Sequence, residues 1–86
     1  MEFELDPAKS ASNLDKHGID FDAIQAIWQD VMRIEIPART TDEPRRLVVG
    51  QIDGKHWSVV VTYRGDRVRI ISARRPRKEE VALYEG

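Results

Sequence analysis

The 86-residue chain contains no cysteine and only two histidines, His17 and His56. The lack of cysteine excludes disulfide bonds and cysteine-based metal sites, and it fits a reducing compartment. Two histidines without cysteine are too few for a typical zinc site. The sequence therefore predicts a cytoplasmic protein that needs neither a metal ion nor another cofactor.

Long apolar runs are also missing. Runs such as Val59-Val60-Val61 are far shorter than the roughly 20 residues of a membrane-spanning helix, and the N-terminus is acidic where a signal peptide would be basic. The sequence has no glycine-rich phosphate loop and no cluster of metal ligands, so P-loop hydrolysis and metal-assisted hydrolysis have no support. We expect one domain over residues 1–86, without membrane association.

Positive charge is present but unevenly distributed. Up to Tyr63 there are seven basic and eleven acidic residues, a net charge of −4, whereas from Arg64 onward seven basic residues meet four acidic ones, a net charge of +3. Six of those seven are arginines, whose planar guanidinium binds phosphate through paired hydrogen bonds. A basic strip on an acidic chain predicts a polyanionic ligand.

Cap and turn signals near the N-terminus predict a short strand and two helices. The strand covers residues 3–5. Asp6-Pro7 begins the first helix, which runs to about Lys16 and stops at Gly18. Asp20 begins the second helix, whose core residues recur at helical spacing. These residues are Phe21, Ile24, Ile27, Trp28 and Val31.

The alternation and turn residues in the rest of the chain predict a small antiparallel sheet. Residues 32–36 alternate like a strand, and residues 38–45 are polar like a loop. Strands over 46–52 and 55–63 pair through Asp53-Gly54, which favours a type I′ hairpin, and a last strand covers 67–74. A terminal helix over residues 77–84 follows Pro76. The expected fold is α+β, with two N-terminal helices packed on a small antiparallel sheet and a short C-terminal helix.

One face of the first helix is polar. It is formed by residues at offsets 0, +4, +7 and +8, namely Lys9, Asn13, Lys16 and His17. The apolar residues of this helix are expected to pack against the rest of the protein. They are Ala8, Ala11 and Leu14. His17 is the residue on the polar face that can exchange a proton near neutral pH. Two interpretations stay open, a solvated face on which His17 caps the helix, or a catalytic face.

The last strand carries arginines on one side. Arg67 and Arg69 lie about 7 Å apart, like neighbouring backbone phosphates, and Arg64 extends the strip from the preceding turn. The side-chain alternation changes by Ile71, which indicates a bulge or the end of pairing. The alternative is an edge strand that charge keeps soluble. Four further basic residues beyond this strip would strengthen a phosphate contact or remain solvated, namely Arg74, Arg75, Arg77 and Lys78.

Aromatic residues are few. Phe21 and Trp28 are expected in the core. Trp57, Tyr63 and Tyr84 flank the basic segment and could stack on a nucleobase, although core packing is the favoured role for Trp57. His56, beside the hairpin turn, is expected at the surface.

Together these residues resemble the signature of the BrnT family of toxins. The N-terminal part of the resemblance is Asp6-Pro7-Ala8-Lys9, Asn13-Leu14, Lys16-His17-Gly18, and Phe21 with Ala23; the C-terminal part is the whole segment 64–74. The resemblance covers nearly the whole chain. The chain departs from the family's usual pattern in its terminal helix, where Glu79 and Glu80 replace basic residues and Pro76 interrupts the usual run.

The resemblance implies a RelE-like fold and the toxin half of a type II toxin–antitoxin system. Such a toxin is a metal-independent endoribonuclease that cleaves RNA and inhibits translation and growth. The resemblance also implies a ribbon-helix-helix antitoxin that neutralises the toxin, in a hetero-oligomer that binds operator DNA through the antitoxin. The implied catalytic residues are Lys16, His17, Arg64, Arg69 and Arg74. The implied RNA-binding residues are Lys9, Asn13, Arg67, Arg75, Arg77 and Lys78.

Two other functions use the same residues. A non-catalytic nucleic-acid-binding module would hold RNA through the arginines, with affinity that falls steeply with salt and no cleavage products. A docking domain would present the basic strand to an acidic partner protein. RNA cleavage and growth arrest relieved by an antitoxin distinguish the toxin from both alternatives.

Overall fold

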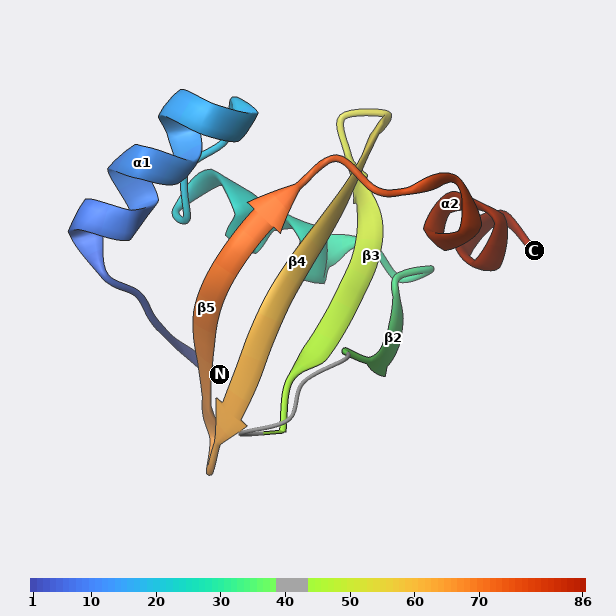
Figure 1. Cartoon of the computed structure of the whole chain (residues 1–86). Coiled ribbons are helices and arrows are strands. Elements are labelled where there is room, and N and C mark those ends of the chain that lie inside the picture. Colours follow the sequence, from blue (N-terminus) through green and yellow to red (C-terminus); the bar gives the residue numbers. More distant parts are fainter. Residues whose placement is uncertain (39–43) are drawn as a thin grey trace.

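In the computed structural model, which describes residues 1–38 and 44–86, five strands form one sheet in the order β1-β5-β4-β3-β2 (Figure 1). Its centre is the predicted antiparallel meander: β3 (Arg46–Ile52), β4 (Lys55–Arg64) and β5 (Arg67–Arg74). Asp53 and Gly54 both have positive φ, 49° and 80°, as a type I′ turn requires. The hairpin prediction is confirmed. Most of the predicted loop over 38–45 lies outside the described residues.

Two short strands extend the meander and correct the predicted fold. β2 (Ile34–Pro37) pairs antiparallel with β3, whereas β1 (Glu2–Glu4) pairs parallel with β5. The sheet is therefore mixed, and the expectation of a small antiparallel sheet was wrong. A parallel pair joins segments that are distant in the chain, so no local turn signal announces it. The class is still α+β.

The second N-terminal helix was also predicted incorrectly. The first, α1 (Pro7–His17), begins with Asp6 accepting a hydrogen bond from the Ala8 amide (2.9 Å) and stops at Gly18 (φ 81°), as expected. The next element, η1 (Ala23–Gln29), is a 3₁₀ helix. Its buried residues, together with Phe21, recur every three residues, which is the period of a 3₁₀ helix. They are Phe21, Ile24 and Ile27.

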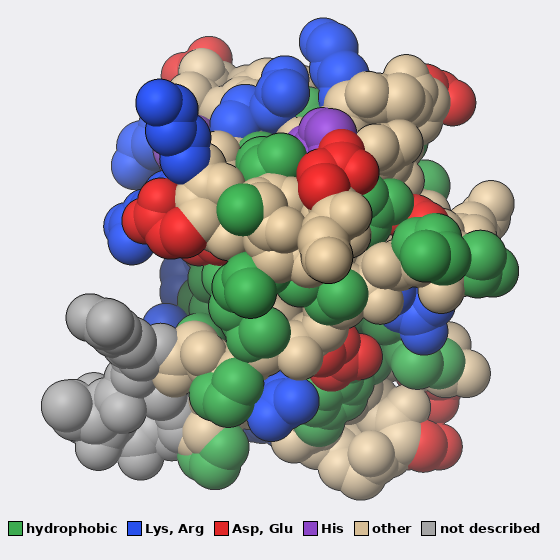
Figure 2. Space-filling view, turned by 90° about the vertical axis from the view of Figure 1, so that its right-hand side faces the viewer, with side chains coloured by type: hydrophobic (Ala, Val, Ile, Leu, Met, Phe, Trp, Pro, Cys, Tyr) green, Lys and Arg blue, Asp and Glu red, His purple; other side chains and the backbone are tan. Residues whose placement is uncertain are grey.

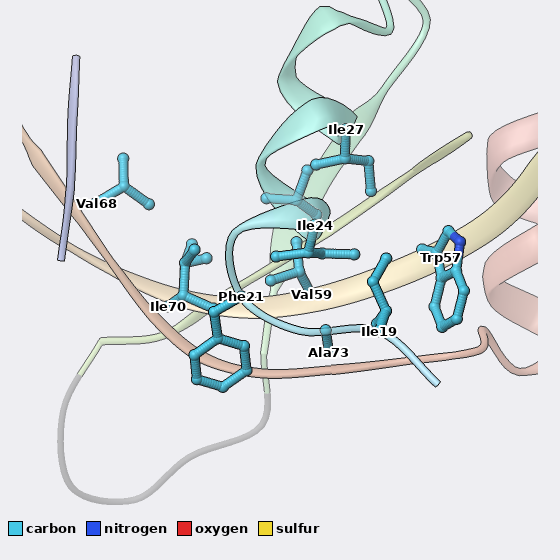
Figure 3. Packing of buried hydrophobic residues seen from close by; sticks show 11 residues of the cluster. Ile19, Phe21, Ile24, Ile27, Trp57, Val59, Val68, Ile70 and Ala73 are labelled. Atoms are coloured by element: carbon cyan, nitrogen blue, oxygen red, sulfur yellow. The ribbon is translucent and has the colours of Figure 1, made fainter. Parts of the chain in front are cut away.

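The hydrophobic core lies between η1 and one face of the sheet, here called the η1 face. Ile24 and Ile27 are fully buried there against sheet residues such as Val59 and Ala73 (Figure 3). η1 approaches β3 closely because Gly50 has no side chain, since a Cβ there would lie 2.7 Å from Ile27. Val31, which was expected in this core, is 88% exposed because η1 ends before it.

The opposite face of the sheet, here called the α2 face, is partly covered by α2 (Lys78–Glu85), which begins one residue later than predicted. A bulge in β5 decides which residues point there. Val60 pairs with Ser72 and Val61 with Ile70, so Ile71 is an extra residue. Of the two outcomes expected from the change of alternation, a bulge or the end of pairing, the bulge is the one observed. Val68, Ile70 and Ala73 consequently all point into the core, whereas Arg69 and Arg74 point to the α2 face.

Candidate active site

One side of α1, formed by Ser10 and Asn13, packs against the protein body. The Asn13 side chain is buried; its amide donates to the Ile19 carbonyl (2.8 Å) and its Oδ1 accepts from the Ala73 amide (3.1 Å). Ser10 Oγ accepts from the Phe21 amide (2.9 Å). The expected packing of α1 was wrong, because three of its apolar residues are exposed. These are Ala8, Ala11 and Leu14.

Asn13 fixes the end of α1 beside the end of β5. It binds Ile19, just after the helix, and Ala73, near the last residue of the strand. Lys16 and His17 occupy the last turn of α1 and are exposed, so they lie where the two elements meet. The structure thus places the end of α1, which carries His17, beside the C-terminal end of β5. The hydrogen bonds of Asn13 hold these two elements together.

Arg75 follows the last residue of β5, and its side chain lies on the η1 face, where Trp57 is buried. Its guanidinium lies 5.2 Å from the centroid of the Trp57 ring. Trp57 is only 8% exposed and belongs to the same core cluster as Ile19, with which it appears in Figure 3. The preference for Trp57 as a core residue is confirmed. Lys16, His17 and Arg75 are here called the α1 corner.

Arg74 points the other way and is already engaged. Its guanidinium donates two hydrogen bonds of 2.9 Å to the carboxylate of Glu80 on α2. Glu80 is 7% exposed and also accepts from Ser58 Oγ (2.8 Å) and the Arg77 amide (3.0 Å). The hydrogen bonds from Arg74 lower the pKa of Glu80 to about 2, and those to Glu80 raise the pKa of Arg74. Arg74 fastens α2 to the sheet.

The other predicted arginines lie away from the α1 corner. Arg64 and Arg67 face each other across the β4–β5 turn, at the far end of β5, roughly 20 Å from Arg74 at 3.3 Å per residue. Arg67 Nε lies 3.9 Å from Glu2 Oε2. Arg69 is half-buried on the α2 face, opposite Thr62. The predicted catalytic set is thus divided between two faces and two ends of β5.

The three remaining predicted RNA-binding residues are exposed. Lys9 lies seven residues before Lys16, two turns away on the same side of α1. Arg77 caps α2 and Lys78 is its first residue, so both follow closely after Arg75. Positive charge therefore extends from the α1 corner both along α1 and toward the start of α2.

The comparisons with known proteins agree with these motifs. A family model described as "Ribonuclease toxin, BrnT, of type II toxin-antitoxin system" matches residues 5–80. The chain belongs to the BrnT family. A search of curated proteins finds no match. The matched span contains α1, strands β2 to β5 and the start of α2, and thus every residue of the α1 corner.

Family membership establishes the general function. This BrnT-family chain is a ribonuclease toxin of a type II toxin–antitoxin system, and such a system implies an antitoxin partner. In residues 1–38 and 44–86, no group of three or more histidine, cysteine, aspartate or glutamate side chains is placed to hold a metal ion. No helix in the same residues has the length and apolar character needed to cross a membrane.

Sequence reasoning missed the contacts that fasten the end of α2 in this BrnT-family chain. The Tyr84 hydroxyl donates to Asp30 Oδ2 (2.5 Å), which raises the pKa of Tyr84 to about 12 and lowers that of Asp30. His56 Nε2 lies 2.9 Å from Glu85 Oε1, and its ring packs edge-on against Tyr84. His56 is half-buried and not at the open surface that was predicted. No sequence signal links these residues, because they come from separate elements.

Proposed function

We propose that this BrnT-family chain is a metal-independent endoribonuclease that cleaves RNA at the α1 corner and thereby inhibits translation and growth. The observation that carries the proposal is the pair of hydrogen bonds made by Asn13. They hold a histidine, the side chain best suited to proton exchange at neutral pH, beside the cationic end of β5.

RNA supplies its own nucleophile for this chemistry. The ribose 2′-oxygen attacks the neighbouring phosphorus, the bond from phosphorus to the 5′-oxygen breaks, and the product carries a 2′,3′-cyclic phosphate and a 5′-hydroxyl. One proton leaves the 2′-oxygen and another is delivered to the 5′-oxygen. His17 is the group in the α1 corner that performs proton transfer. Lys16 and Arg75 stabilise the negative charge that builds up on the phosphate.

Other basic residues hold the RNA backbone. Lys9 extends the cationic surface along α1, and Arg77 and Lys78 extend it beyond Arg75. Contacts of this kind position a nucleic acid and make its affinity depend on salt, without reading sequence. Asn13 acts as a positioning residue, because its side-chain NH₂ group and its Oδ1 are both hydrogen-bonded to the backbone of the protein. Arg64, Arg67, Arg69 and Arg74 lie outside this proposed cleavage site.

The partner is proposed to be a ribbon-helix-helix antitoxin. The motifs that the chain shares with the BrnT family support this proposal, as does the matching description of a type II system. The two proteins would form a hetero-oligomer that binds operator DNA through the antitoxin, so that the pair represses its own operon.

The experiment that tests the cleavage chemistry compares two oligonucleotides in excess chelator. One is all RNA, and the other has a single 2′-deoxyribose at the site where the first is cut. We expect the first to be cleaved with a cyclic phosphate end and the second to stay intact at that position. Cleavage at the deoxyribose would contradict the proposed nucleophile. Salt-dependent binding of RNA without any cleavage would favour a non-catalytic nucleic-acid-binding module.

A further inference from the structure

A shallow hollow of about 540 Å³ lies on the α2 face, between the end of β2, the sheet and α2. Aliphatic and charged side chains line it together: the aliphatic ones include Ile36, Leu47, Val60 and Leu83, and the charged ones include Arg74, Arg77 and Glu79. Leu83 is 57% exposed although it is a large apolar side chain. On the side of the molecule that carries α2 and β2, hydrophobic side chains form a band below a group of basic ones (Figure 2). Exposed apolar surface with a polar rim is typical of a binding site.

The lining favours a protein over RNA as the occupant. None of the described residues that line the hollow is aromatic, whereas single-stranded RNA is usually held by stacking on aromatic rings. The aliphatic side chains of the lining give RNA no such stacking surface, whereas they match aliphatic side chains of a partner protein.

Cations beside the hollow indicate which kind of protein it accepts. Arg77 lines it and is exposed. Arg69 points to the same face, opposite Thr62, two residues along β4 from Val60. Among the described residues, no carboxylate forms an ion pair with Arg69. An acidic, amphipathic segment would place aliphatic side chains in the hollow and carboxylates at these two arginines.

We propose that the hollow on the α2 face binds an acidic amphipathic segment of the antitoxin. The inference takes from the family only that an antitoxin partner exists, and it does not depend on the chemistry proposed for the α1 corner. The α2 face and the α1 corner lie on different sides of β5. Antitoxin binding and RNA cleavage should therefore be separable by substitutions inside the hollow other than at Arg77, which also belongs to the proposed RNA-binding surface.

The test measures binding of the antitoxin from the same operon to purified variants by calorimetric titration, with RNA cleavage measured in parallel. Leu83→Asp places a carboxylate among the aliphatic side chains of the lining, where it meets both apolar surface and the partner's acidic charge. We expect its affinity for the antitoxin to fall by at least about tenfold while RNA cleavage stays at the parent rate. Leu14→Asp is the matched control, because Leu14 is 49% exposed on α1, and it should bind the antitoxin like the parent.

Two outcomes would overturn the inference. Antitoxin affinity that is unchanged in Leu83→Asp would show that the partner does not use the hollow. Reduced RNA binding with intact antitoxin binding would assign the hollow to RNA instead. A parent chain that fails to cleave RNA would count against the proposed function alone, since the antitoxin titration needs no cleavage.

Discussion

Replacing His17 by glutamine is expected to slow RNA cleavage by about 10²–10⁴-fold, the usual contribution of general acid–base catalysis. Glutamine keeps the polarity and approximate size of the side chain but cannot exchange a proton at neutral pH. The side chain of His17 is exposed and makes no hydrogen bond with the described residues, so the free energy of unfolding should change little. The measurement is a single-turnover cleavage rate, combined with urea unfolding of the same protein.

The chain offers a matched control for this substitution in its other histidine. His56→Gln removes a ring that contacts Glu85 and Tyr84 on the far side of the sheet from α1. This variant is expected to lose some stability while its folded fraction cleaves RNA at the parent rate. If instead His17→Gln cleaves like the parent, His17 transfers no proton in the reaction and the proposed assignment is wrong.

Replacing Arg74 by alanine is expected to lower the free energy of unfolding by about 3 kcal/mol. The substitution leaves the carboxylate of Glu80, which is 7% exposed, without its charged partner. Breaking a buried ion pair from one side typically costs about 3–5 kcal/mol, and the lower end applies because the Arg74 side chain is 26% exposed. Urea unfolding at neutral pH measures the loss, and Arg69→Ala, an arginine of the same strand without such a pair, should lose about 1 kcal/mol or less.

The same ion pair makes the free energy of unfolding depend on pH in acid. The pKa of Glu80 is lowered from 4.5 to about 2 in the folded chain, so the pair contributes its full stability above pH 4.5 and loses it as the pH falls toward 2. Arg74→Ala should therefore lose part of this acid sensitivity, and its stability should approach that of the parent near pH 2. A parent and variant that differ equally at pH 7 and at pH 2 would contradict this role for the pair.

Local signals in the sequence were sufficient for the elements that depend on neighbouring residues. Asp6-Pro7 and Gly18 define α1 because caps act within one turn, and Asp53-Gly54 defines the central hairpin because its backbone conformation fits few other residues. The bulge at Ile71 was visible as a break in alternation. Sequence motifs also led to the correct family, since the BrnT model matches residues 5–80.

Contacts between distant segments could not be predicted in this way. No sequence signal near β1 indicates its parallel pairing with β5. The amide of Asn13 reaches Ala73, sixty residues away, so one residue of the face that looked solvated or RNA-binding proved to hold the helix on the protein, while Lys9, Lys16 and His17 are exposed. Likewise Arg74 was grouped with the other arginines by sequence, and only the position of Glu80 on α2 shows that its charge is already paired.

The most direct test of the proposed active site is a map of where RNA binds. The ¹⁵N-labelled parent chain would be titrated with a 2′-O-methyl oligoribonucleotide, which cannot be cut, and backbone amide shifts followed by NMR. The account predicts that the perturbed amides cluster at residues 16–19 and 73–75, where Asn13 joins α1 to β5. Perturbations centred instead on Leu47, Val60 and Leu83 would place the RNA on the α2 face and contradict it.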